Sequence, residues 1–366
     1  MNQGVVGQRI SRHEHSAGIL RRSPTSTPRA TSSARPGVFQ STLQWVESVG
    51  EQRMTRAFHH VPVLESEVLA AFGSVVPGVI VDATLGGAGH ATSILANYPE
   101  LSVLGIDRDA VARDAAIARL LPFGSRARVV AGTFSNLADF VAQESEWIDG
   151  RPVVGVLLDL GVSSPQLDDE SRGFSFRADA PLDMRMDASS GVTAAEFIAQ
   201  VDLDSLRALL REHGEDKFAH GIAKAIIAKQ PTTTSELVAA VESAVPMAAR
   251  RRGHVATRVF QALRVAINEE ERELAEGLAG ALEVLAPGGS LVVISYHSGE
   301  DRVVKEFLKY QATGGCTCPV MLGCVCGAVV TMTVARGGAL VASEEETMRN
   351  PRARSARMRI GVKVSA

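Results

Sequence analysis

Short apolar runs alternate with helical patterns along the chain beyond residue 78. Four runs are typical of buried parallel strands: Val79–Ala83, Val103–Asp107, Arg128–Gly132 and Val153–Gly161. Helical patterns lie between them at His90–Ala96, Asp109–Arg119 and Ser135–Gln143. This alternation predicts a parallel sheet with helices on both of its faces.

The alternation stops after the fourth run. Residues 168–254 show helical patterns and no strong strand: Ala194–Gln200, Leu203–His213, Lys217–Lys229 and Ser235–Val245. Strand and helix patterns then return as a long helix at Thr257–Leu285, a strand at Leu291–Tyr296, a helix at Glu300–Tyr310 and an edge strand at Arg357–Val364. We expect one Rossmann-like α/β domain, built from residues 54–167 and 255–366, with an all-helical domain, residues 168–254, inserted into it.

Composition narrows the class of protein. The 366 residues are 45% hydrophobic and 22% charged, an ordinary globular mixture. The net charge of −3 excludes a general positive field, so a nucleic acid would have to meet local patches. No apolar run approaches the ~18 residues that span a bilayer, so no membrane partner is expected. All four cysteines fall between Cys316 and Cys326, which favours a reducing compartment, the cytoplasm, over secretion.

The first 53 residues differ from the rest. Seven arginines and three glutamates give them a charge of +4, which leaves −7 for the remainder of a chain of net charge −3. Residues 23–36 consist only of Ser, Thr, Pro, Arg and Ala, a composition typical of disorder. We expect a disordered extension, or a true start at Met54; an organellar transit peptide is the alternative.

The loop after the first strand, Asp82–His90, is rich in glycine and precedes a helix, so its backbone can approach a nucleotide-type ligand. Thr92 stands where the dinucleotide-binding pattern has its third glycine, and Asp82 would repel a pyrophosphate, so an NAD-dependent dehydrogenase is disfavoured. The cationic S-adenosylmethionine (SAM) suits an acid there. Asp107 is placed to accept both ribose hydroxyls, and the Phe134 ring to lie on the adenine. A plain turn with capping aspartates is the alternative.

Asp159 ends the fourth strand, near the point where the order of strands is expected to reverse. Ligands of open α/β sheets bind beyond the carboxyl ends of strands at such a point. Asp159 is therefore expected to face the reacting centre.

Several long motifs carry a family resemblance. They are HVPVL (His60–Leu64), LLDLGVSSPQLDD (Leu157–Asp169), RGFSF (Arg172–Phe176), PLDMRMD (Pro181–Asp187), HVATRVFQALRVAIN (His254–Asn268), LAPGGSLVVISYHSGEDRVVK (Leu285–Lys305) and NPRARSARMR (Asn350–Arg359). From about residue 60 onward the chain resembles the bacterial ribosomal RNA small subunit methyltransferase H family. The resemblance implies a SAM-dependent methyltransferase fold with an inserted helical domain, and methylation of N4 of a cytidine in the decoding centre of 16S ribosomal RNA.

The same resemblance implies the SAM contacts. They are Ala88, Gly89, His90, Asp107, Phe134, Asp159 and Gln166. Two residues depart from the family pattern: Ala88 stands where other members often have glycine, and Gly299 where they usually have leucine. Residues 1–53 have no counterpart in the pattern.

Methylation of N4 requires a proton acceptor, because the lone pair of N4 is conjugated into the ring until a proton is withdrawn. Asp159 is the first candidate and a nearby backbone carbonyl the second. The base must also leave its stack. Phe174 and Phe176 are candidates to stack on it, with ordinary core packing as the alternative.

Two arginine clusters are expected to bind RNA phosphates. The first contains Arg250, Arg251, Arg252 and Arg258, with Arg264 further along, and the second contains Arg349, Arg352, Arg354, Arg357 and Arg359. A solvated helix face is the alternative for any single arginine. The size of this surface predicts an assembled or nearly assembled small subunit as substrate, in place of a short oligonucleotide.

The cysteines form two CxC pairs, Cys316 with Cys318 and Cys324 with Cys326. Four thiolates within eleven residues suit a tetrahedral zinc site, and four reduced thiols in a loop are the alternative. A non-catalytic SAM-binding factor of small-subunit assembly is the competing function. A homodimer stays open, because nothing in the sequence sets the oligomeric state.

Overall fold

The computed structural model describes residues 62–161, 169–215, 217–247, 255–319, 325–335 and 338–364. Several predictions concern residues outside these ranges, namely those for residues 1–53, Gln166, Arg250, Arg251, Arg252 and Cys324.

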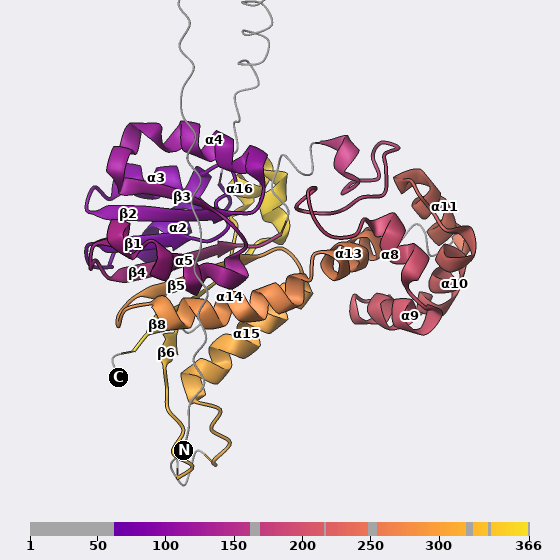
Figure 1. The fold of residues 1–366 in the computed structure, drawn as a ribbon. Coiled ribbons are helices and arrows are strands. Elements are labelled where there is room, and N and C mark those ends of the chain that lie inside the picture. The colour runs from indigo at the N-terminus through magenta and orange to yellow at the C-terminus, as the bar shows by residue number, and fades with distance from the viewer. Residues whose placement is uncertain are drawn as a thin grey trace, which may run out of the picture. The chain divides into compact units, whose positions relative to one another are not determined.

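A sheet of eight strands forms the centre of the part that the structure describes (Figure 1). The strands are β1 (Gly78–Asp82), β2 (Leu101–Asp107), β3 (Ala127–Ala131), β4 (Val153–Asp159), β5 (Ser290–Ser295), β6 (Met332–Val334), β7 (Leu340–Val341) and β8 (Arg357–Lys363). Their order is β3-β2-β1-β4-β5-β8-β6, and β7 also pairs with β8. Strands β1 to β5 are parallel, and β8 is antiparallel to β5. The predicted Rossmann-like α/β class is confirmed, with the order of strands reversing between β1 and β4.

The described ranges also contain α-helices, some of which cover both faces of the sheet while others, between β4 and β5, build a separate core. They are α2 (Glu65–Phe72), α3 (Gly89–Asn97), α4 (Ala110–Leu120), α5 (Leu137–Gln143), α6 (Ser145–Ile148), α8 (Ala194–Gln200), α9 (Leu203–Glu212), α10 (Ala219–Lys229), α11 (Thr234–Ser243), α13 (Val255–Ile267), α14 (Glu270–Val284), α15 (Ser298–Thr313) and α16 (Glu344–Arg349). No helix in the described ranges is long and apolar enough to cross a membrane.

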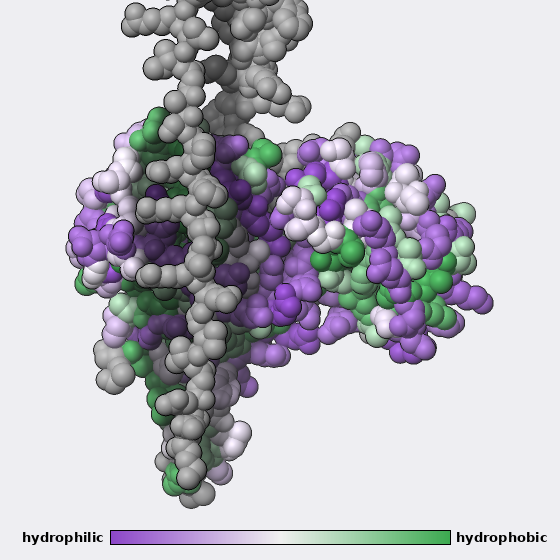
Figure 2. Space-filling model, viewed as in Figure 1, coloured by the Kyte–Doolittle hydropathy of each residue, from purple (hydrophilic) through white to green (hydrophobic). Residues whose placement is uncertain are grey.

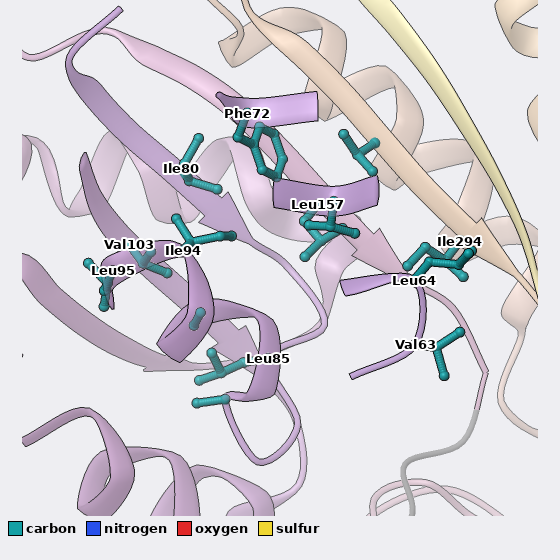
Figure 3. Packing of buried hydrophobic residues seen from close by; sticks show 14 of the residues in the cluster. Val63, Leu64, Phe72, Ile80, Leu85, Ile94, Leu95, Val103, Leu157 and Ile294 are labelled. Atoms are coloured by element: carbon teal, nitrogen blue, oxygen red, sulfur yellow. The ribbon is translucent and has the colours of Figure 1, made fainter. Parts of the chain in front are cut away.

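The central strands β1, β2, β4 and β5 are largely apolar because both of their faces are buried. In β5, Val292 and Ile294 pack into one core with α2 and α3, while Leu291 and Val293 pack into the other with α14 and α15. Figure 3 shows the first core, where the ring of Phe72 lies close to Ile80. Gly155 in β4 permits this packing, since a Cβ there would lie 2.5 Å from both side chains.

A third core is built by the helices between β4 and β5 together with the segment before them. It includes Leu206 of α9, Ile222 of α10 and Leu237 of α11. The helical patterns predicted for residues 194–245 are confirmed, and the only strand-like pairing in that described part is an isolated bridge. Val259 of α13, beyond the suggested boundary at 254, also joins this core. The domain limits stay a prediction.

The prediction of one long helix over Thr257–Leu285 is wrong, because the chain forms two helices there, α13 and α14. Glu269 between them has the left-handed backbone, φ 50° and ψ 35°. The neighbouring Asn268 accepts a hydrogen bond from the Met186 N–H at 2.7 Å and donates one to the Met184 carbonyl at 2.9 Å. The break is therefore made by a distant segment that no local pattern reveals.

The edge position expected for the last strand is also wrong. Strand β8 lies between β5 on one side and β6 and β7 on the other. The outer strands have three and two residues, too few to give a period-two pattern.

Candidate functional site

A cavity of about 530 Å³ lies beyond the carboxyl ends of β1, β2 and β4. Its wall includes five of the residues expected at a SAM site: Gly89, His90, Asp107, Phe134 and Asp159. The cavity also lies where the order of strands reverses, which is where open α/β sheets bind ligands.

The loop after β1 is held by the end of β2. The Gly86 N–H donates to Asp107 Oδ2 at 2.7 Å, and the Asp109 N–H donates to Asp107 Oδ1 at 2.8 Å. Each carboxylate oxygen retains a lone pair for a further donor. Burial raises the pKa of Asp107, although both backbone donors oppose that shift. Asp107 can thus position the loop and still accept hydroxyl groups from a ligand.

Ala88 is the N-cap residue of α3 and has a left-handed backbone, φ 58° and ψ 37°. This conformation favours glycine, and for alanine it costs roughly 1 kcal/mol. The side chain is fully buried in the first core. Its methyl group therefore packs away from solvent, and only the backbone of this residue is suited to meet a ligand.

Asp159 is held from two sides. The Tyr296 hydroxyl donates to Oδ1 at 2.8 Å, and His90 Nε2 lies 3.6 Å from Oδ2, within ion-pair range. The Asp159 N–H donates to Thr84 Oγ1 at 2.6 Å, which ties the end of β4 to the end of β1. The orientation of this carboxylate is thereby fixed at the cavity wall.

His90 and Asp82 carry buried polar atoms that lack hydrogen bonds within the chain: both ring nitrogens of His90, and Asp82 Oδ1. Burial lowers the pKa of His90, but the carboxylates of Asp159 and Asp82 outweigh it and raise the pKa above its ordinary value. Burial raises the pKa of Asp82 to about 7. Asp82 is 2% exposed and does not line the cavity. It can therefore act on a ligand through its charge but not through a direct contact.

The wall also contains a second set of buried charges, most of which are paired, although His297 Nε2, 3.0 Å from Glu300, has no hydrogen bond among the described residues. Arg264 donates to both carboxylate oxygens of Glu270, each at 2.7 Å, and lies 3.7 Å from Glu300. His297 caps α15, accepting the Glu300 N–H at 3.3 Å. Burial raises the pKa of Glu300, but His297 and Arg264 outweigh it and leave the pKa below its ordinary value.

Gly299, which departs from the family pattern, lines the same wall of the cavity. A Cβ there would lie 3.1 Å from His297 Nδ1, a tight contact. The glycine therefore leaves the capping histidine room in this chain.

The two phenylalanines expected to stack on a base pack against the helical core. The Phe176 ring meets the Phe260 ring edge to face, with 5.2 Å between centroids. The Arg172 guanidinium lies 6.0 Å from the centroid of Phe174. Neither phenylalanine lines the cavity, which favours the core-packing alternative.

Several of the arginines pair with carboxylates. Arg258 pairs with Glu215, Arg264 with Glu270, and both Arg357 and Arg359 with Asp301. The side chains of Arg349, Arg352 and Arg354 are exposed, and Arg352 also lines the cavity.

Tyr296, Thr84 and Glu270 are site residues that sequence reasoning missed, and Arg264, expected to bind RNA, pairs with Glu270 instead. Tyr296 had a usable signal, because it ends a predicted strand. Thr84 acts through a contact with Asp159, 75 residues further along the chain, and no local pattern marks it.

The strand order and the position of the cavity define the class of fold as that of Rossmann-like, SAM-dependent methyltransferases. The profile of the MraW methylase family matches residues 57–364, and the chain belongs to that family.

Curated relatives agree with this membership. The ribosomal RNA small subunit methyltransferase H of Geobacter sp. (strain M21) is 46% identical over 314 residues, covering 84% of this chain and 99% of the relative. The proteins of the same name from Heliobacterium modesticaldum and Carboxydothermus hydrogenoformans are 44% and 45% identical, with the same coverage. Among solved structures, a putative rRNA-methylase from Clostridium thermocellum aligns with a TM-score of 0.39 at 12% identity, over 83% of this chain and 100% of that chain. A TM-score of 0.39 at 12% identity supports no functional argument.

Proposed function

We propose that this chain methylates the exocyclic N4 of a cytidine in the decoding centre of 16S ribosomal RNA, with SAM as the methyl donor. The observation that carries the proposal is the Asp159 carboxylate, held at the cavity wall by Tyr296 and His90. The names of the relatives support a small-subunit rRNA substrate. A cytoplasmic location follows from that substrate.

The residues around the cavity fit SAM. Asp107 offers acceptors for the ribose hydroxyls, and the Phe134 ring offers a face for the adenine. Gly277 of α14 lets the helix lie against that ring, since a Cβ there would lie 2.5 Å from it. The ring nitrogens of His90, which line the cavity without a hydrogen bond among the described residues, suit a polar group of the ligand, because a buried polar atom without a partner costs about 1–3 kcal/mol.

When bound, SAM supplies a methyl group on a sulfonium sulfur, which an amine can displace. Asp159 would hold the N4 amine in line with that methyl group: Oδ1 accepts from Tyr296, and Oδ2, 3.6 Å from His90 Nε2, retains a lone pair for an N4 proton. One proton would leave N4 for the carboxylate as the nitrogen–carbon bond forms and the carbon–sulfur bond breaks.

The substrate is expected to be the small subunit or a late assembly form of it. Arg352, which is exposed and lines the cavity, and the nearby exposed Arg354 would contact phosphates remote from the base. Such contacts would help to place an extruded base at Asp159. A short oligonucleotide lacks these phosphates and should be methylated poorly.

The test uses the full chain, small subunits from cells that lack the gene, and SAM labelled in its methyl group. Mass spectrometry of nucleosides should find labelled N4-methylcytidine. Asp159→Asn should slow the reaction at least ~100-fold at saturating SAM. Asp114→Asn is the matched control, because Asp114 is exposed on α4 and should leave the rate unchanged.

Two outcomes would overturn the proposal in different ways. Subunits without labelled N4-methylcytidine, but with SAM bound to the chain, would favour the non-catalytic assembly factor. Asp159→Asn with a rate within a few-fold of the unmodified chain would leave the reaction standing and point to a backbone carbonyl as the proton acceptor.

A further inference from the structure

The segment between α15 and β6 contains every cysteine of the chain. In the part of it that the structure describes, the sulfur atoms of Cys316, Cys318 and Cys326 all lie within 4.8 Å of one another. None of the three is in a disulfide bond. The fold thus brings together thiols from both ends of this segment.

The spacing of these sulfur atoms suits a metal ion better than a covalent bond. A zinc ion with bonds of about 2.3 Å to sulfur holds tetrahedral ligands roughly 3.8 Å apart. A disulfide needs its two sulfurs at about 2.05 Å, and a single disulfide can join only two of the three thiols. A small inward movement of each side chain would complete a metal site that uses all three.

Cys318 lies beside both of the other thiols. The Val325 N–H hydrogen-bonds to its sulfur, and the thiols of Cys326 and Cys316 do so as well. These contacts hold the sulfur of Cys318 where one ion could reach all three sulfur atoms.

The segment has few other means of holding its shape. Its base is closed where the Thr331 N–H donates to the Gln311 carbonyl at 3.0 Å. Beyond that base, Val325 is 87% exposed and Val329 is 72% exposed. Hydrophobic surface is visible at the position of this segment in Figure 2. Small units that cannot bury a core usually depend on a metal or a crosslink.

We propose that Cys316, Cys318 and Cys326 bind one zinc ion through their thiolates, and that the ion fixes the segment between α15 and β6. The site is structural and separate from methyl transfer, so either proposal can fail without the other. Glu270, His297 and Glu300 also bring ligand atoms together in the described part, but Arg264 already occupies both oxygens of Glu270.

The first experiment measures zinc in the full chain, purified without chelator and desalted after incubation with zinc chloride. Titration with a mercurial thiol reagent should release about one zinc ion per chain, in step with the modified thiols. Because all four cysteines of the chain lie in this segment, release by this reagent shows that the ion is bound by thiolates of the segment. Zinc below about a tenth of an ion per chain, or zinc that the reagent does not release, would overturn the proposal.

The second experiment compares two variants. Cys318→Ser should lower the bound zinc at least tenfold, whereas His297→Asn, in the competing cluster, should retain it. The reverse pattern would overturn the assignment. If Cys318→Ser does not fold, cobalt substitution of the unmodified chain decides: sulfur-to-cobalt charge-transfer bands are expected, and a cobalt spectrum without them would contradict thiolate ligands.

Removal of the ion should act locally. A chelator should make residues 314–331 sensitive to protease while leaving the affinity for SAM unchanged. Unaltered cleavage of this segment after complete zinc removal would contradict a role for the ion in fixing it.

Discussion

Two clusters of buried charge lie at one cavity, and their partners differ. At the strand ends, Asp82 Oδ1 and both ring nitrogens of His90 have no hydrogen bond among the described residues. In the second cluster, Arg264 is paired in bidentate fashion with Glu270 and also lies near Glu300, although His297 Nε2 has no hydrogen bond there. A carboxyl pKa is raised in the first cluster and lowered in the second, although both are buried. The difference teaches that the partners of a buried carboxyl group, and not burial alone, decide the direction of its pKa shift.

Breaking the paired cluster should have the largest effect. Arg264→Met leaves Glu270 and Glu300 without their cation in a buried site, so the free energy of unfolding should fall by roughly 3–5 kcal/mol. Urea denaturation measures it. Arg207→Ala, which breaks the exposed pair with Asp204, is the control and should change that free energy by no more than about 0.5 kcal/mol. A loss below about 1 kcal/mol for Arg264→Met would contradict the view of this wall as a paired structural element.

The cluster of Asp82 and His90 should make the stability of the chain depend on pH. Asp82 has a pKa of about 7 when folded and an ordinary value of 3.8. Between these values the folded state binds more protons, so stability is fully present below 3.8 and is lost as the pH rises through 7. Asp82→Asn removes this loss. The free energy of unfolding of the variant, relative to that of the unmodified chain, should rise by roughly 3 kcal/mol as the pH goes from 5 to 8.

Denaturation at several pH values checks this expectation, with Asp114→Asn as the control. The charged groups facing Asp82 are His90, Asp159 and Asp107. His90 also has a raised pKa, so its contribution is likewise lost as the pH rises. A constant difference in stability between the two chains from pH 5 to pH 8 would show that Asp82 does not titrate in this range.

Asp107 sharpens the comparison, because it stands beside the unpaired cluster but already has two backbone donors. Asp107→Ala should weaken SAM binding by roughly 1.5–3 kcal/mol through loss of charged hydrogen bonds to the ribose. Calorimetry with SAM measures it. Asp107→Asn keeps the shape of the side chain and one acceptor oxygen, so its affinity for SAM should lie between those of the unmodified chain and the alanine variant. Unchanged affinity in the alanine variant would rule out a ribose contact at this position.

The parallel sheet could be predicted because its central strands are largely apolar and alternate with helical patterns. The helix pattern that begins at Asp109 is also confirmed, since the Asp109 side chain caps α4 by accepting the Val111 N–H at 2.9 Å. The break between α13 and α14 could not be predicted, since it depends on Asn268 binding a segment more than eighty residues away. Local sequence carries no trace of such a partner.

The candidate site divides in the same way. Gly89, Asp107 and Asp159 follow strands, and the rule that ligands bind beyond strand ends places them together. Whether an arginine faces solvent or a glutamate depends on packing, which is why Arg258, Arg264 and Arg359 could not be told apart from Arg352 and Arg354 in the sequence.

The hydrogen bond between Tyr296 and Asp159 joins residues 137 positions apart in the chain. Strand β4 therefore leaves the ribosome long before β5, its parallel neighbour, has been made. At roughly 5–20 residues per second, this apolar strand has one edge unpaired for on the order of ten seconds during synthesis. The helices that lie between the two strands are made in that interval. Their prompt folding would shorten the time in which a central strand of this protein is open to aggregation.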